Sequence, residues 1–141
     1  MKEKKHNPFK LKAFRGINPE VIGKLEALRI KSAEQMLVAG QTKKLRSALA
    51  KQTGIAESVL LELVKLSDLA RLPGVKGIRA RLYYDAGVDS VEKMANWDPD
   101  ALRVMMIKYV EQTGFNGIPP LPKEVSSTIE NARMLPKVVE F

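Results

Sequence analysis

The chain has 141 residues, with 24 lysines and arginines against 16 aspartates and glutamates and a formal net charge of +8. This length predicts one domain, or two small units that share a core. Cysteine is absent and the single histidine is His6, which excludes a disulfide scaffold, thiolate-ligated zinc and a cysteine nucleophile, and argues against a histidine zinc site or a Ser-His-Asp triad. We therefore expect a basic binding protein that needs no cofactor or metal and catalyses no reaction.

Helical periodicity interrupted by glycine and proline predicts an all-α fold. Asn18-Pro19, Ser32, Thr42, Ser90 and Asp98-Pro99 are expected to cap helices at their N-termini. The expected helices cover about residues 19–28, 33–39, 43–53, 57–71, 77–86, a short stretch after Ser90, 99–113 and 123–134. The segment 117–122, GIPPLP, cannot be helical and predicts an irregular connection.

An internal repeat runs through these helices. The stretch that begins at Gly16 aligns with the stretch that begins at Gly74, an offset of 58 that also joins Ser32 to Ser90 and Met36 to Met94. Further along, KQTG at 51–54 matches EQTG at 111–114, and DLAR at 68–71 matches ENAR at 130–133. The repeat predicts a basic leader over 1–13, a first unit over 14–71, a second unit over 72–135 and a tail over 136–141.

Each unit begins with a glycine-containing turn. Leu72-Pro73-Gly74-Val75, a helix with Ala80 in its first turn, and the later Ala86-Gly87-Val88 are similar to a helix-hairpin-helix motif. In that motif a tight turn directs backbone amides at the start of the second helix outward, where a phosphate fits the unpaired N–H groups and the helix dipole. Such contacts hold the nucleic-acid backbone and read no bases.

The whole pattern, from about Phe14 to Leu135, resembles the helix-hairpin-helix family catalogued as domain of unknown function 4332. This resemblance implies two tandem helix-hairpin-helix (SAM-like) repeats that pack into one compact helical domain. Nucleic-acid binding is then an analogy with other proteins that contain the motif. The chain departs from the usual Gly-hydrophobic-Gly turn, because Asn18 and Lys76 occupy the second glycine position and Arg29 stands where the second unit has Gly87.

Charge favours the second hairpin as a phosphate site. The net charge is +5 over residues 1–15, +4 over 16–54 and −1 over the rest of the chain. Near the second hairpin, basic residues begin a helix without intervening acids, whereas Glu20 follows the first hairpin. The predicted nucleic-acid site comprises Gly74, Lys76, Gly77, Arg79 and Arg81, together with Lys43, Lys44 and Arg46 at the start of another helix; Gly16, Asn18 and Lys24 form a secondary hairpin site.

The leading hypothesis is a non-catalytic module that binds a nucleic-acid backbone, most simply that of duplex DNA, without sequence preference. The alternative is a protein-interaction or scaffold domain whose hairpins only pack helices; a DNA glycosylase is a third reading, weakened because Asp85, Asp89, Asp98 and Asp100 are explained as caps or surface charges. The aromatic residues are scattered and predict no stacking platform for single strands. No segment is long and apolar enough to cross a bilayer and no signal peptide is recognisable, so we expect a cytoplasmic protein with no membrane partner.

Overall fold

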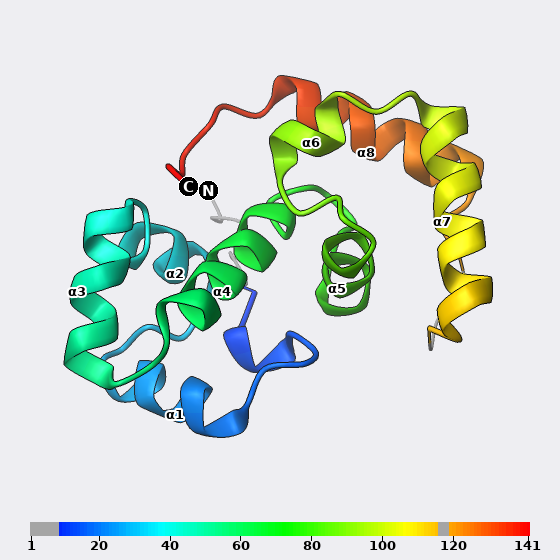
Figure 1. Cartoon of the computed structure of the whole chain (residues 1–141). Helices are drawn as coiled ribbons and strands as arrows, with labels where there is room; N and C mark the ends of the chain where they lie inside the picture. Colours follow the sequence, from blue (N-terminus) through cyan, green and yellow to red (C-terminus); the bar gives the residue numbers. More distant parts are fainter. Residues whose placement is uncertain (1–8, 116–118) are drawn as a thin grey trace, which may run out of the picture.

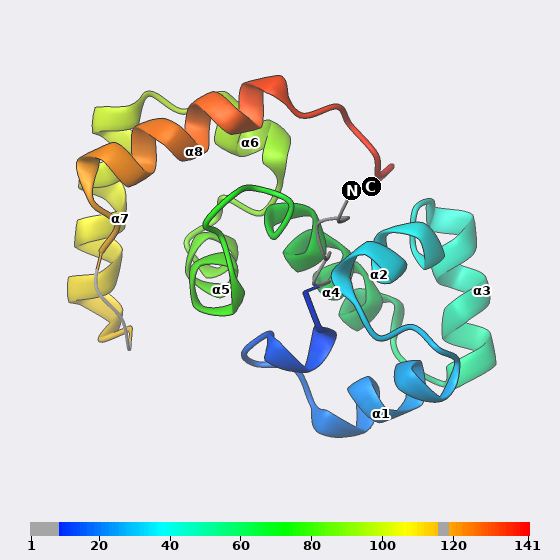
Figure 2. The same cartoon turned by 180° about the vertical axis from the view of Figure 1, so that it is seen from behind.

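A computed structural model describes residues 9–115 and 119–141; residues 1–8 of the predicted leader and 117–118 of the predicted connection lie outside this range. The described residues form only helices, with one isolated bridge between Lys10 and Ser32 and no strand. The elements are η1 (Leu11–Ala13), α1 (Pro19–Ala27), α2 (Ala33–Ala39), α3 (Lys43–Thr53), α4 (Glu57–Leu69), α5 (Gly77–Asp85), α6 (Val91–Ala95), α7 (Pro99–Thr113) and α8 (Pro122–Met134). The predicted all-α class is therefore confirmed. Helices α1–α4 gather on one side of the molecule and α6–α8 on the other, with α5 beside α4 (Figures 1 and 2).

Polar side chains fix where the helices begin. Ser32 Oγ accepts from the amide of Gln35 at 3.1 Å, and the Gln35 side chain accepts from the amide of Ser32 in return. Asn18, Thr42, Ser90 and Asp98 accept from amides in the first turns of α1, α3, α6 and α7. Each cap of this kind contributes about 1 kcal/mol. The five predicted N-caps are thus confirmed, whereas η1 was not predicted, because three residues are too few to show helical periodicity.

The backbone conformation repeats along the chain. Helix α5 begins and ends 58 residues after α1, and the preceding Gly16 and Gly74 have nearly the same positive φ, 81° and 82°. After these helices Arg29 (φ 66°) occupies the place of Gly87 (φ 100°). A left-handed arginine costs roughly 1 kcal/mol, so the turn keeps its geometry although the glycine is absent.

Helix α4 is the central element of the core. Leucines 60, 63, 66 and 69 on α4 are fully buried, and α4 packs against α2, α3 and α5. In the second half of the chain α8 packs against α6 and α7, which correspond in chain order to α2 and α3. Burying a leucine contributes roughly 2 kcal/mol, so α4 joins the two halves chiefly through its apolar side chains.

The segments that flank the two predicted units belong to the core as well. Leu11, in the predicted leader, is fully buried, and its amide donates to the carbonyl of Lys31 at 2.9 Å. In the predicted tail Val139 is buried and the amide of Glu140 donates to the carbonyl of Gln41 at 2.9 Å. The C-terminal segment thus returns from α8 to the loop before α3 and ties the second half to the first (Figures 1 and 2).

Candidate nucleic-acid interface

The turn between α4 and α5 exposes its backbone. Leu72 and Val75 are buried and close the turn with a 3.0 Å hydrogen bond from the amide of Val75 to the carbonyl of Leu72. Gly74 and Lys76 are exposed between and after them, and no atom lies within 4 Å of the position that a Cβ on Gly74 would take. Lys76 is the N-cap of α5, and its ammonium group, which has no acceptor atom, makes no cap hydrogen bond. Helix α5 therefore lacks the N-cap acceptor that α1, α2, α3, α6 and α7 have.

Gly77 serves packing instead of ligand contact. It is buried, and a Cβ built on it would lie 2.3 Å from the carbonyl oxygen of Ala13 in η1. Its φ is not in the left-handed region, so the close approach of η1, and not the turn, requires a glycine here. The predicted role of Gly77 in approaching a phosphate does not fit this position, because the η1 backbone already lies against it.

The two arginines of α5 point into the protein. Arg79 donates to the Glu124 carboxylate of α8 at 2.7 and 3.2 Å. Arg81 is 9% exposed; its Nε donates to the carbonyl of Arg15 at 2.8 Å and its NH2 lies 2.8 Å from a carboxylate oxygen of Glu62 on α4. Burial opposes the charged form of Arg81, but the acceptors Glu62 and Asp85 outweigh it and raise its pKa. Both side chains are thus engaged in internal ion pairs, and Arg81 in particular is withdrawn from the predicted interface.

These ion pairs place α5 between the two halves of the chain. Glu62 on α4 and Glu124 on α8 are 62 residues apart, the same offset as DLAR and ENAR. Glu62 pairs with Arg81, and Glu124 pairs with Arg79. Charged pairs of this geometry specify orientation, because a slipped α5 would leave partly buried charges without partners.

The predicted group at the start of α3 is divided. Lys43 and Lys44 are exposed, whereas Arg46 is 3% exposed and donates to the carbonyls of Gly40 at 2.8 Å and Phe141 at 3.1 Å. Burial lowers the pKa of Arg46, only partly opposed by nearby glutamates. Helix α3 lies on the opposite side of α4 from α5 (Figures 1 and 2), so the fold does not bring Lys43 and Lys44 to the second hairpin.

At the first hairpin, the Arg81 guanidinium lies against one side of the exposed Gly16. The Arg81 guanidinium lies about 2.9–3.1 Å from the position of a Cβ on Gly16. Asn18 Oδ1 accepts from the amide of Glu20 at 2.9 Å, which occupies the place that a phosphate would need. Lys24 is exposed one turn later, on the side of α1 near Gly54.

A groove lies beside the second hairpin, and we call it the hairpin groove. Its volume is about 810 Å³, and its walls include Phe9, Leu37 and Leu72 with Lys10, Lys12 and Lys76. A smaller hollow of about 450 Å³ shares Lys10 and Lys12 and adds Lys31. The N-terminal excess of charge and the second hairpin therefore meet on one surface through Lys10 and Lys12, which the sequence placed only in a leader.

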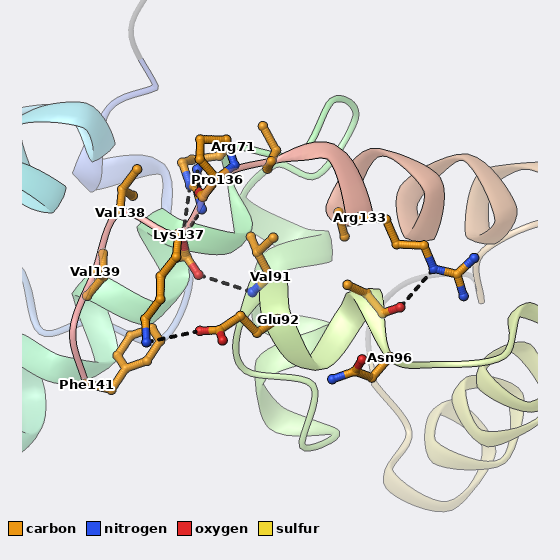
Figure 3. A pocket seen from close by; sticks show the side chains of 14 residues that line it. Arg71, Val91, Glu92, Asn96, Arg133, Pro136, Lys137, Val138, Val139 and Phe141 are labelled. Carbon is orange, nitrogen blue, oxygen red and sulfur yellow. Dashed lines mark hydrogen bonds and ion pairs between the residues drawn. The ribbon is translucent and has the colours of Figure 1, made fainter.

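Another pocket, of about 460 Å³, lies between the ends of α4, α6 and α8 and the C-terminal segment (Figure 3). Arg71 pairs with Asp68 at 2.8 Å, and Lys137 lies 3.8 Å from Glu92. Figure 3 shows the labelled Phe141 at one end of the pocket and Asn96 at the other. These four charged groups pair with one another, and Arg133, which also lines the pocket, donates to the carbonyl of Ala95 at 3.0 Å; the charged side chains of this pocket are thus engaged within the protein.

The chain is an all-α protein whose sequence repeats internally. Residues 15–135 match the family described as Domain of unknown function (DUF4332). The match covers most of the chain, so the chain belongs to this family. No curated protein and no solved structure matches it.

Residues 9–115 and 119–141 contain neither a candidate membrane span nor a candidate metal cluster. No described helix combines the length and the apolar character that spanning a bilayer requires. Within the same residues, no cluster of three or more histidines, cysteines, aspartates or glutamates could hold a metal ion.

Proposed function

We propose that the chain is a non-catalytic module of two tandem helix-hairpin-helix units that binds the phosphate backbone of nucleic acid, most simply duplex DNA, without sequence preference. The observation that carries the proposal is the surface around the second hairpin. There, an exposed left-handed turn at Gly74 lies beside Lys10, Lys12 and Lys76. Exposed backbone at a turn and several ammonium groups both favour a phosphate.

The proposed site is smaller than the one expected from the sequence. Arg81 and Arg46 are buried against internal acceptors, and Arg79 is paired with Glu124. Three lysines then supply most of the charge, so binding should be weak and strongly dependent on salt. With three phosphate contacts on DNA, the affinity should fall about 40-fold between roughly 50 and 200 mM salt.

The test is fluorescence anisotropy of a labelled duplex of about 20 base pairs at these two salt concentrations. The double variant Lys12→Glu/Lys76→Glu should bind more weakly and should show a salt slope reduced by about two. The matched control is Lys43→Glu/Lys44→Glu, which makes the same change of charge on exposed residues at the far side of α4. Equal loss in both variants would show that net charge, and not this surface, attracts the duplex.

A protein-interaction or scaffold domain is the second candidate, and a specific observation favours it. The Arg81 guanidinium packs against Gly16 of the first hairpin, and the arginines of α5 pair with acids on α4 and α8. Both features are what a hairpin used only for packing would show. Folded wild-type protein that does not bind duplex DNA at low salt would support this candidate against nucleic-acid binding.

A further inference from the structure

The hairpin groove contains an aromatic ring beside the start of α5. Phe9 is partly exposed in its wall, with its ring centroid 4.9 Å from that of the buried Phe14. The Cζ of Phe9 lies 3.7 Å from the position of a Cβ on Gly77. The sequence suggested scattered aromatics without a platform, but the fold brings these two rings together next to the helix end where a phosphate would lie. One face of a planar group could therefore stack on Phe9 while its phosphate reaches Lys76.

A buried hydroxyl in the same groove has no partner. Ser67 on α4 is fully buried, and its Oγ has no hydrogen-bond partner among residues 9–115 and 119–141. Ser67 belongs to the wall of the hairpin groove. A buried hydroxyl without a partner is unfavourable unless a ligand or a water supplies the hydrogen bond. This observation is independent of the helix start and points to a ligand that carries polar atoms at its edge.

The charges at the groove define the rest of the ligand. Lys10, Lys12 and Lys76 line the groove together with apolar side chains such as Leu37 and Leu72, and they outnumber the one acid among the described residues that line it, Glu34. The occupant should therefore combine a flat, largely apolar body, polar atoms at its edge and an attached anion. A nucleotide has these three properties, and the groove volume of about 810 Å³ lies within the range of small-molecule sites.

We propose that the hairpin groove accepts one unpaired base at a strand end, stacked on Phe9 and within reach of Ser67, while its phosphate lies against Lys12 and Lys76. The inference rests on the proposed function and makes it more specific: the ligand is a duplex with an unpaired terminal nucleotide. The backbone lysines alone would bind a blunt duplex, and the base in the groove would add affinity for an overhang. Stacking of one base on an aromatic side chain corresponds to about tenfold in affinity.

The experiment compares one duplex in two forms, blunt and with a short single-stranded overhang, by anisotropy at low salt. The terminal base of the overhang is replaced by 2-aminopurine, whose fluorescence reports the change of stacking when the base enters the groove. Wild-type protein should bind the overhang form about tenfold more tightly and should change the 2-aminopurine signal. Phe9→Leu should reduce this preference to less than about twofold, whereas Phe141→Leu, which changes an aromatic outside the walls of the hairpin groove, should keep it.

A second variant tests the base site independently if Phe9→Leu does not fold. Ser67→Ala removes only the unpartnered hydroxyl, so it should fold at least as well as wild type and lower the preference for the overhang by about twofold, less than Phe9→Leu does. Ser58→Ala, on the exposed start of α4, is its control and should bind like wild type.

Four results would overturn the inference. Equal affinity for blunt and overhanging duplex would refute the base site and leave backbone binding intact, whereas binding to neither form would refute both. Adenosine monophosphate that competes as well as the overhang strand, or an acidic amphipathic peptide that displaces it, would assign the groove to a different ligand.

Discussion

A methyl group at position 77 would collide with the backbone of η1. The Cβ of Gly77→Ala would lie 2.3 Å from the carbonyl oxygen of Ala13 and 3.3 Å from its carbonyl carbon. Backbone cannot rotate away as a side chain can, so η1 and α5 must separate by more than half an ångström. Overpacking of this kind costs roughly 1–3 kcal/mol, and the gain from replacing glycine at the first residue of a helix offsets only part of it.

Alanine substitutions at two other glycines provide reference values for the loss of stability in Gly77→Ala. Gly23 lies inside α1 with nothing within 4 Å of an added Cβ and no positive φ, so Gly23→Ala should stabilise the protein by about 0.5–1 kcal/mol. Gly74 also has open space but a φ of 82°, so Gly74→Ala should cost about 1 kcal/mol through backbone strain alone. Gly77→Ala should be the most destabilising of the three.

Urea unfolding followed by circular dichroism measures all three variants. With an m-value of about 2 kcal/mol per molar, the midpoint of Gly77→Ala should fall by roughly 0.5–1 M and that of Gly23→Ala should rise. A Gly77→Ala protein as stable as Gly23→Ala would refute the close contact between η1 and α5. The position of Lys10 and Lys12 beside the second hairpin would then lose its support as well.

Three further predictions concern charged and polar groups of α5 and its neighbours. Arg81→Met should destabilise the protein by about 2 kcal/mol, because it leaves the partly buried carboxylate of Glu62 without its cation; the exposed Arg15→Met is the control in the same urea assay. Burial opposes the charge of Asp89, but hydrogen bonds from Lys65 and Lys93 outweigh it and lower its pKa. A lowered pKa stabilises the folded state above the unfolded value of about 3.9, and this contribution is lost as the pH falls below it. Asp89→Asn should therefore be about 1 kcal/mol less stable at neutral pH, with a difference that shrinks below about pH 4 in a pH series of unfolding curves. Burial, supported by Glu124, raises the pKa of Tyr83 to about 12, so ionisation in the unfolded state reduces stability as the pH rises from about 10 towards 12. Tyr83→Phe also removes a buried hydroxyl without a partner; it should be at least as stable at neutral pH and more stable at alkaline pH, and a wild-type protein that resists alkali equally would contradict this.

The two closing helices differ in how much of their surface is buried. At the offset of 62, Val64 and Leu69 of α4 correspond to Ser126 and Asn131 of α8. Val64 and Leu69 are fully buried, with Val64 against the loop at Gly40, whereas their counterparts are partly exposed and Glu130 beside them is exposed. Apolar side chains on several sides of a helix need partners, whereas polar ones are stable in water.

The sequence by itself determined the local structure. The N-caps, the prolines that follow two of them and the glycines at the helix ends act within one turn of the chain, so their positions alone predicted the helix boundaries to within about two residues. The offset of 58 likewise predicted that Gly16 and Gly74 would occupy equivalent places. Even the substitution of Arg29 for a glycine left the conformation unchanged.

Only the tertiary structure decided which charges face the solvent. Lys76, Arg79 and Arg81 are neighbours in sequence, yet one is exposed, one pairs with Glu124 and one is buried against Glu62. Their partners lie on α4 and α8, far along the chain, and no local pattern reports them. The tertiary structure likewise decides where the residues that give the net charge of +8 lie on the surface. Part of its N-terminal excess reaches the second hairpin because η1 packs against Gly77, whereas Lys43 and Lys44 remain on the far side of α4, since helix packing, and not charge, sets where each element lies.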